Sequence, residues 1–375
     1  MSTPTEVLPK LGWEALIEHW RSDLLAGFLV FLIALPLCLG IALASGFPPA
    51  AGIITAVVGG LIVSRLNGSY VTINGPAAGL IVVILNSVQV LGEGDPIAGY
   101  HYTLAAIMLA GALQFLMGVN RLGQWSTLVP SAVVHGMLAA IGIIILAKQS
   151  HVLLGVTPNT DSIITALIQI PQSLFHPQPQ IALIGLTGLG VLIVWPLLKQ
   201  PTLKLIPAPI MVLVTGMLLG QFFGLQHEHL HPFLSSAEIV AGHEHLIAPQ
   251  YLVDLPDQVS AFFALPDFAK MTSLTFWEAV LSICLVGSLE TLLSANAVDK
   301  LDPYKRQSDL DQELTAVGLG NMIVGFIGGL PMIAEIVRSS ANINNGAKTA
   351  WANFFHGLIL AVFVVFFPQD RKSVV

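Results

Sequence analysis

The chain has 375 residues, of which 54% are hydrophobic and 10% are charged, and its formal net charge is −7. Soluble globular domains carry about 25% charged residues, so this composition predicts a polytopic membrane protein rather than a soluble enzyme. The negative charge and the lack of a basic patch argue against nucleic acid as a partner. Cys38 and Cys284 lie in separate apolar runs, which excludes a disulfide framework and a cysteine metal motif.

Apolar segments long enough to cross a bilayer follow one another along most of the chain. A membrane helix needs about 20 such residues. Residues 1–22 form an amphipathic lead-in without the features of a cleaved signal peptide. Lysines and arginines fall mainly in loops that are cytoplasmic if the N-terminus is cytoplasmic, which predicts a multi-pass protein of the inner (cytoplasmic) membrane in that orientation. The predicted spans are 23–45, 48–66, 71–90, 102–119, 131–147, 180–198, 206–224, 274–297, 312–328, 330–345 and 350–368.

Two of these spans, 71–90 and 330–345, are interrupted by glycine, proline and polar residues. They are the third and tenth spans, so they occupy corresponding places in two halves offset by seven spans. Paired interrupted helices of this kind are typical of secondary transporters built from inverted repeats, here seven plus seven spans. The alternative is that glycine and proline are simply common in membrane helices.

A helix that starts inside the membrane points free backbone N–H groups and a positive dipole end into the protein interior. Two such starts predict an anion site that needs little side-chain charge. Pro76 is expected at the first helical position of the first segment. The predicted substrate-binding residues are Ile73, Asn74, Gly75, Pro76, Ala77, Ala78, Glu335, Ile336, Val337, Arg338 and Ser339.

Among the charged side chains within the predicted spans, Glu290, Glu335 and Arg338 are singled out, because charge inside a membrane is costly and usually functional. Arg338 either adds positive potential beside the anion or forms a structural ion pair with Glu335, three residues earlier on the same helical face. Glu290 either holds a proton or cation, with Ser294 one turn later, or is hydrogen-bonded to a neighbouring helix. Glu290, Ser294 and Glu335 are therefore the predicted coupling-ion residues.

Histidines give two weaker signals. The segment 225–273 contains five of them, and its H-x-H spacings do not match a closed zinc site, so a solvated extracellular loop is favoured over a metal site. His135 and His356 stand singly in spans and are expected to be hydrogen-bonded helix histidines. Without a nucleophile–base pair, no enzyme activity is predicted, and no metal or cofactor is implied.

A series of motifs resembles the sulfate permease (SulP) family of inorganic anion transporters. The resemblance covers nearly the whole chain in the correct order. The motifs are Asp23-Leu24-Leu25-Ala26-Gly27, Ala34-Leu35-Pro36, Ala42-Leu43-Ala44-Ser45-Gly46, Gly75-Pro76, Gln312-Glu313-Leu314 with Gly318 and Asn321, Gly328-Gly329-Leu330-Pro331, Arg338-Ser339 and Gly346-Ala347-Lys348-Thr349.

The resemblance implies that a core domain (23–119 and 274–369) moves against a gate domain that includes 120–224. A small inorganic anion, bicarbonate or sulfate, would bind between spans 3 and 10 and be coupled to H⁺ or Na⁺. The resemblance places the family's sodium-binding acid at Glu290, where glutamate replaces the usual aspartate, and the family's sodium-binding hydroxyl at Ser294. Val337 stands where many members have serine. A homodimer is also implied.

The resemblance also suggests that the chain is incomplete. About 11 of 14 spans are present, a cytoplasmic STAS domain is missing, and residues 370–375 are expected to be an artefactual tail. A nucleobase permease of the same architecture is an alternative, although 72–82 contains no aromatic residue for a base to contact. An anion channel is the other alternative.

Overall fold

The computed structural model describes residues 8–10, 12–123, 131–156, 163–198, 208–225 and 262–366. The chain divides into two compact units. Unit 1 comprises Met1–Leu138 and Pro256–Pro368, and unit 2 comprises Ala139–Leu255 and Gln369–Val375. The five loop histidines, the side chain of His135 and the predicted tail 370–375 lie outside the described residues.

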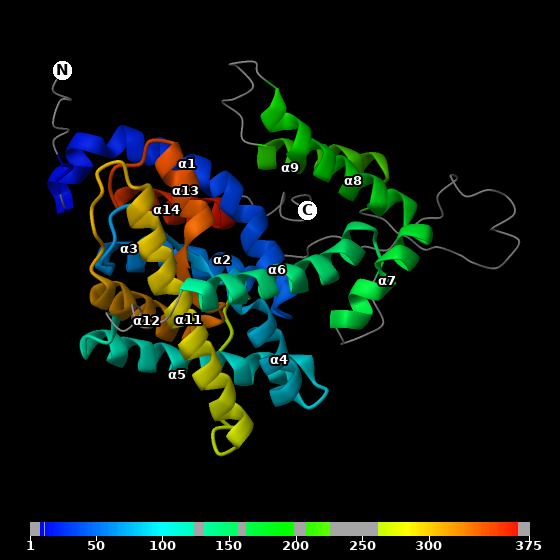
Figure 1. Cartoon of the computed structure of the whole chain (residues 1–375), viewed down its shortest axis with the longest axis horizontal. Coiled ribbons are helices and arrows are strands. Elements are labelled where there is room, and N and C mark those ends of the chain that lie inside the picture. The colour runs from blue at the N-terminus through cyan, green and yellow to red at the C-terminus, as the bar shows by residue number, and fades with distance from the viewer. Residues whose placement is uncertain are drawn as a thin grey trace, which may run out of the picture. The chain divides into compact units, whose positions relative to one another are not determined.

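Helices make up most of both units (Figure 1). Unit 2 contains α7 (Ile163–Phe175), α8 (Pro179–Val194) and α9 (Ala208–Phe222), and α6 (Ser131–Leu153) crosses the boundary between the units. The helices of unit 1 are α1 (Gly12–Ala44), α2 (Pro49–Val58), α3 (Ser64–Leu66), α4 (Ile81–Gly92), α5 (Pro96–Val119), α11 (Leu274–Leu301), α12 (Leu310–Ile327), α13 (Ile336–Asn344) and α14 (Trp351–Phe366).

Several described helices are long and apolar enough to cross a membrane: α1, the run Pro49–Leu66, α5, the run Pro179–Leu197 and α11. The membrane class expected from composition is therefore confirmed. Helix α1 begins at Gly12, so residues 12–22 of the expected lead-in continue directly into the first span. Helix α7 was not predicted, because its thirteen residues are too few to register as a span.

Unit 1 is held together by helices that approach closely at glycines. Helix α5 packs along α12, and a Cβ added at Gly111 would lie 2.6 Å from the Met322 nitrogen. A Cβ at Gly325 would lie 2.6 Å from the Met108 nitrogen. In lipid, where helices gain little from burying apolar surface, such small residues allow the backbone contact that drives association.

The two interrupted spans form short strands instead of continuous helices. Strand β1 (Ile73–Pro76) and strand β2 (Met332–Glu335) pair antiparallel and are buried at every position. The pairing was not predicted from the sequence, although the interruption of both spans was. The 3₁₀ turn η2 (Ala78–Leu80) and then α4 follow β1, while α13 follows β2 directly. Helix α12 ends before β2 at Gly328, which adopts a left-handed φ of 102°.

Candidate functional site

The strand pair brings the two interrupted segments, far apart in sequence, into direct contact. Ile73 lies opposite Glu335 and Pro76 lies opposite Met332. The Ala77 N–H extends the ladder by donating to the Pro331 carbonyl at 2.9 Å. Because the pair is antiparallel, α4 and α13 begin at opposite ends of the same short ladder, so both positive helix ends point back toward it.

At neither helix start does the N-cap residue's own side chain form a capping hydrogen bond. At the start of α13 the first-turn N–H groups are therefore available to an acceptor. In η2 the Gly79 N–H already donates to the Glu290 carboxylate. Pro76 is the last residue of β1 and not the first residue of a helix, so that prediction was wrong. Its missing N–H suits a strand end equally well.

Side chains from neighbouring helices satisfy the outer backbone groups of the strands. Asn321 of α12 donates to the Met332 carbonyl at 3.1 Å and accepts from the Met332 N–H. Ser339 Oγ accepts from the Ile73 N–H at 2.9 Å. Non-helical backbone is stable at membrane depth only when such partners replace water. These side chains therefore stabilise the non-helical conformation of both segments and fix their position.

Glu313 of α12 fixes the approach to β1. Its carboxylate accepts the Gly68 N–H (3.1 Å), the Ser69 N–H (3.2 Å), the Ser69 hydroxyl and the Asn74 amide (3.2 Å). Asn74 in turn accepts from Asn353 of α14 at 3.0 Å. The carboxylate is fully buried, and these four donors supply the hydrogen bonds that a buried acid requires.

Arg338 and Glu335 form a buried ion pair with the guanidinium Nε 3.3 Å from a carboxylate oxygen. The arginine is fully buried and also donates from Nη1 to the Cys38 sulfur of α1 at 3.3 Å. A Cβ at Gly75 would lie 2.5 Å from Arg338 Nη1, so glycine is what allows the guanidinium to lie against β1. The predicted ion pair is therefore present, and the arginine lies between β1 and α1.

Glu290 of α11 lies against the start of the first half-helix. The Gly79 N–H donates a hydrogen bond to its carboxylate, and a Cβ at Gly79 would overlap both carboxylate oxygens. Glu290 Oε2 and Glu335 Oε1 are buried and have no hydrogen-bond partner among the described residues. Two incompletely satisfied carboxylates thus lie within electrostatic range of each other, and Glu335 is the one paired with Arg338.

The predicted site residues fall into two sets. Residues 73–77, Glu335, Arg338 and Ser339 are buried within unit 1, whereas Ile336 and Val337 are exposed on it, at 42% and 67%. Ser294 is half-buried one turn beyond Glu290 on α11 and forms no hydrogen bond with it in the described part of the chain. The structure therefore joins Glu290 to the strand pair but leaves Ser294 apart.

Further polar side chains belong to this cluster, of which the sequence singled out His356 but not Ser288 or Thr291. Ser288 and Thr291 flank Glu290; the buried Thr291 hydroxyl lacks a partner among the described residues, and Ser288 interacts with the Cys284 thiol. His356 of α14 is fully buried, and neither ring nitrogen has a hydrogen-bond partner in the described chain, so the expected hydrogen-bonded histidine was wrong. Nothing in their local sequence patterns distinguishes these residues from ordinary helix positions.

With this geometry established, comparison with known proteins decides the family. The model of the sulfate permease family matches residues 20–372. This chain belongs to the sulfate permease family. YvdB of Bacillus subtilis (strain 168) is 27% identical over 356 residues, which are 94% of this chain and 61% of YvdB. The bicarbonate transporter BicA of Picosynechococcus is 27% identical over 350 residues, 92% of this chain and 57% of BicA.

The fold is also shared with a solved structure. The transmembrane domain of a cyanobacterial bicarbonate transporter BicA matches with a TM-score of 0.77 at 22% identity, over 97% of this chain and 86% of that domain. The chain spans about three fifths of the length of YvdB and BicA. The family and architecture expected from the motifs are confirmed, and membership in a permease family agrees with the expectation that the chain is not an enzyme.

Proposed function

We propose that this chain carries a small inorganic anion, bicarbonate or sulfate, across the cytoplasmic membrane together with H⁺ or Na⁺. The observation that supports the anion is the β1–β2 pair with a helix start at each end, of which the start of α13 has no capping side chain and the other has Glu290 at the Gly79 N–H. Backbone N–H groups and helix dipoles stabilise negative charge without a protein cation at the site. Bicarbonate and sulfate both fit this chemistry, and both stand among the names of the family and its members.

The acids around the strand pair support coupling to a cation. Glu335 pairs with the buried Arg338, and Glu290 lies within electrostatic range of Glu335, so the three groups carry a net negative charge when both acids are ionised. A negative cluster repels an anion, and charges in a low-dielectric interior interact strongly. Uptake of a proton or a sodium ion by Glu290 neutralises the cluster and lets the anion bind. Cation and anion then cross together.

Alternating access supplies the movement. In this proposal unit 1 is the core domain that holds the site, and helices of unit 2 belong to the gate domain. The strand pair, its two half-helices and all three charged groups lie within unit 1, so the site travels as one piece. The N-terminus is cytoplasmic in the proposed orientation.

Uptake in proteoliposomes tests the coupling. Labelled sulfate and labelled bicarbonate are offered with an imposed pH gradient, with a sodium gradient, and with neither. We expect saturable uptake of one anion that one gradient accelerates. In Glu290→Gln we expect that acceleration to disappear, whereas Glu278→Gln, an exposed acid on the same helix, should behave as wild type.

Two results would contradict the proposal. A response of Glu290→Gln to the gradient as full as that of wild type would remove Glu290 from coupling. Alternatively, anion flux could be conductive and unsaturable in wild type, which would make the protein a channel. Competition between the two labelled anions in the same vesicles identifies the preferred substrate.

A further inference from the structure

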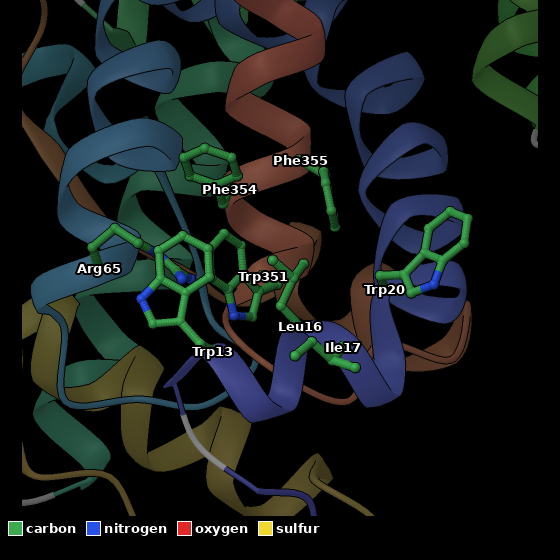
Figure 2. Close-up of a pocket in the computed structure, with 8 residues that line it drawn as sticks. All are labelled: Trp13, Leu16, Ile17, Trp20, Arg65, Trp351, Phe354 and Phe355. Atoms are coloured by element: carbon green, nitrogen blue, oxygen red, sulfur yellow. The ribbon is translucent and has the colours of Figure 1, made fainter.

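An apolar groove with a single cation opens on unit 1, far along α1 from the strand pair (Figure 2). Its volume is 810 Å³. Trp13 and Ile17, on the first turns of α1, are 74% and 78% exposed, far more than large apolar side chains of a packed core. The residues used below are Trp13, Ile17 and Trp20 of α1, Trp351 and Phe355 of α14, and Arg65 of α3.

The sequence builds this groove from an amphipathic stripe. Trp13, Ile17 and Trp20 recur at helical spacing on α1, while Glu14 and Glu18 occupy intervening positions. With 33 residues, α1 is about 50 Å long, well beyond the roughly 30 Å of hydrocarbon, so its first turns reach the membrane surface. An amphipathic helix rich in tryptophan is typical of segments that lie in that interface.

Contacts fix the first turns of α1 across the start of α14. Trp351 Nε1 donates to the Gly12 carbonyl at 2.9 Å, and the Trp13 and Trp351 rings lie 5.3 Å apart. Figure 2 shows Trp20 further along α1, on the far side of the opening from Arg65. The groove is therefore a formed feature with aromatic walls from two helices.

Arg65 provides the charge. Its guanidinium carbon lies 3.7 Å from the Trp351 ring centroid and 5.5 Å from that of Phe354. Stacking on a ring uses the face of the guanidinium; its Nε donates to the Ser64 hydroxyl at 3.4 Å and the Asp23 carboxylate acts on it electrostatically, while no hydrogen bond is made by the two terminal Nη groups among the described residues. Within the described residues Arg65 has no carboxylate within ion-pair distance, whereas the nearby Arg306 is paired with Asp302 at 2.7 Å.

A second, polar groove of 450 Å³ adjoins the apolar one and shares Arg65 and Trp351 with it. Lys10, Asn67 and Arg306 contribute to its lining. Arg65 thus lies at the junction between the apolar groove and a polar groove that is also lined by Asp309 and by two cations paired with acids, Lys10 with Glu14 and Arg306 with Asp302. An amphiphile with an anionic head group needs such an apolar groove for its chain next to a polar groove for its head.

The grooves lie at the more positive end of unit 1. Helices α1, α12 and α14 begin at this end, and α3, α5 and α11 end there. At the opposite end the described part of unit 1 carries Lys270, which is paired with Glu93 at 2.6 Å. The excess of lysine and arginine over the opposite end indicates the cytoplasmic side, whose leaflet is rich in anionic lipid. The cations at the grooved end are Lys10, Arg21, Arg65, Arg121, Lys300, Lys305, Arg306 and Lys348.

The geometry points to a binding site for an anionic phospholipid. Its phosphate lies on the edge of Arg65 and in the polar groove, and one acyl chain lies along Trp13, Ile17, Trp20 and Phe355. Charge complementarity favours this occupant over a zwitterionic lipid, because the choline group would face Arg65, Lys10 and Arg306. The volume of the apolar groove, 810 Å³, and its aromatic lining favour a lipid with a long chain over a free phosphate.

Native mass spectrometry of the full chain in detergent measures this binding. The protein is mixed with dioleoyl phosphatidylglycerol, dioleoyl phosphatidylcholine or short-chain dihexanoyl phosphatidylglycerol. We expect retention of the long-chain anionic lipid and little of the other two. Arg65→Gln should weaken its binding about fivefold, the contribution typical of one basic residue at an anionic surface. Trp20→Ala should weaken it while preserving every charge.

Lys300→Gln is the matched control, because it removes an exposed cation from the same end without touching either groove. Arg65→Lys keeps the charge and should retain most binding, which separates a charge effect from a folding defect. Equal retention of both dioleoyl lipids, or equal losses in Arg65→Gln and Lys300→Gln, would overturn the proposal. So would a lipid-free dimer that Trp20→Ala dissociates, because the groove would then belong to a second copy of the chain.

Discussion

The two interrupted segments reach the same backbone arrangement by different chemistry. The first, from Thr72 to Leu80, carries no charged side chain and is positioned by Glu313 and Asn353 from outside. The second, from Pro331 to Ser339, carries its own ion pair, Glu335 with Arg338. The pairing of β1 with β2 is symmetric, but the groups that hold each strand are not.

In the proposed mechanism this difference corresponds to a division of roles within one site. The uncharged segment would contribute small residues and backbone N–H groups to anion binding, and the charged segment together with Glu290 would set the charge that a coupling ion changes. An inverted repeat needs to preserve only the backbone geometry, so each half is free to specialise in side-chain chemistry.

The largest effect should come from breaking the ion pair of the second segment. Arg338→Gln leaves the buried Glu335 carboxylate without its cation, and losses of about 3–5 kcal/mol are typical of such half-removals. Thermal or denaturant unfolding in detergent measures the change. The double variant Glu335→Gln with Arg338→Gln should recover most of the stability. A double variant as unstable as Arg338→Gln would show that the arginine acts through Cys38 or packing instead.

A smaller loss is expected on the uncharged side. The Glu313 carboxylate accepts four hydrogen bonds. In Glu313→Gln one of its oxygens becomes an NH₂ group, which faces hydrogen-bond donors instead of acceptors. Hydrogen bonds to a charged group contribute about 1.5–3 kcal/mol, so we expect a loss of about 2 kcal/mol. Glu278→Gln, exposed on α11, should change stability little under the same unfolding protocol. Equal behaviour of the two variants would mean that Glu313 does not hold β1.

The smallest effect should come from the link between the segments. Ser339→Ala removes the hydroxyl that accepts the Ile73 N–H, at an expected cost of about 1 kcal/mol. Hydrogen exchange at the Ile73 amide should accelerate at the same time. Ser340→Ala, whose hydroxyl does not contact β1, serves as the control. Unchanged exchange in Ser339→Ala would contradict this link.

The sequence was informative wherever the membrane restricts the choice of residue. Proline, glycine and charge within apolar spans identified both interruptions and the Glu335–Arg338 pair, because lipid tolerates such residues only for a reason. Strand pairing was missed because the four-residue strands β1 and β2 are too short for a periodic signal. The role of Asn321, quoted only as part of a motif, depends on a contact between α12 and β2 that no local pattern encodes.

The most direct test of the account is equilibrium binding of labelled sulfate and bicarbonate to the purified chain with alanine at Gly79. The new methyl group would displace the Glu290 carboxylate, which is the end of a flexible side chain, so the fold should survive. Gly40→Ala is the control, since a Cβ at Gly40 meets nothing within 4 Å. We predict saturable binding of one anion by wild type and Gly40→Ala, and at least about tenfold weaker binding by Gly79→Ala. Equal affinity in all three proteins, or no saturable binding by wild type, would contradict an anion site at the paired helix starts.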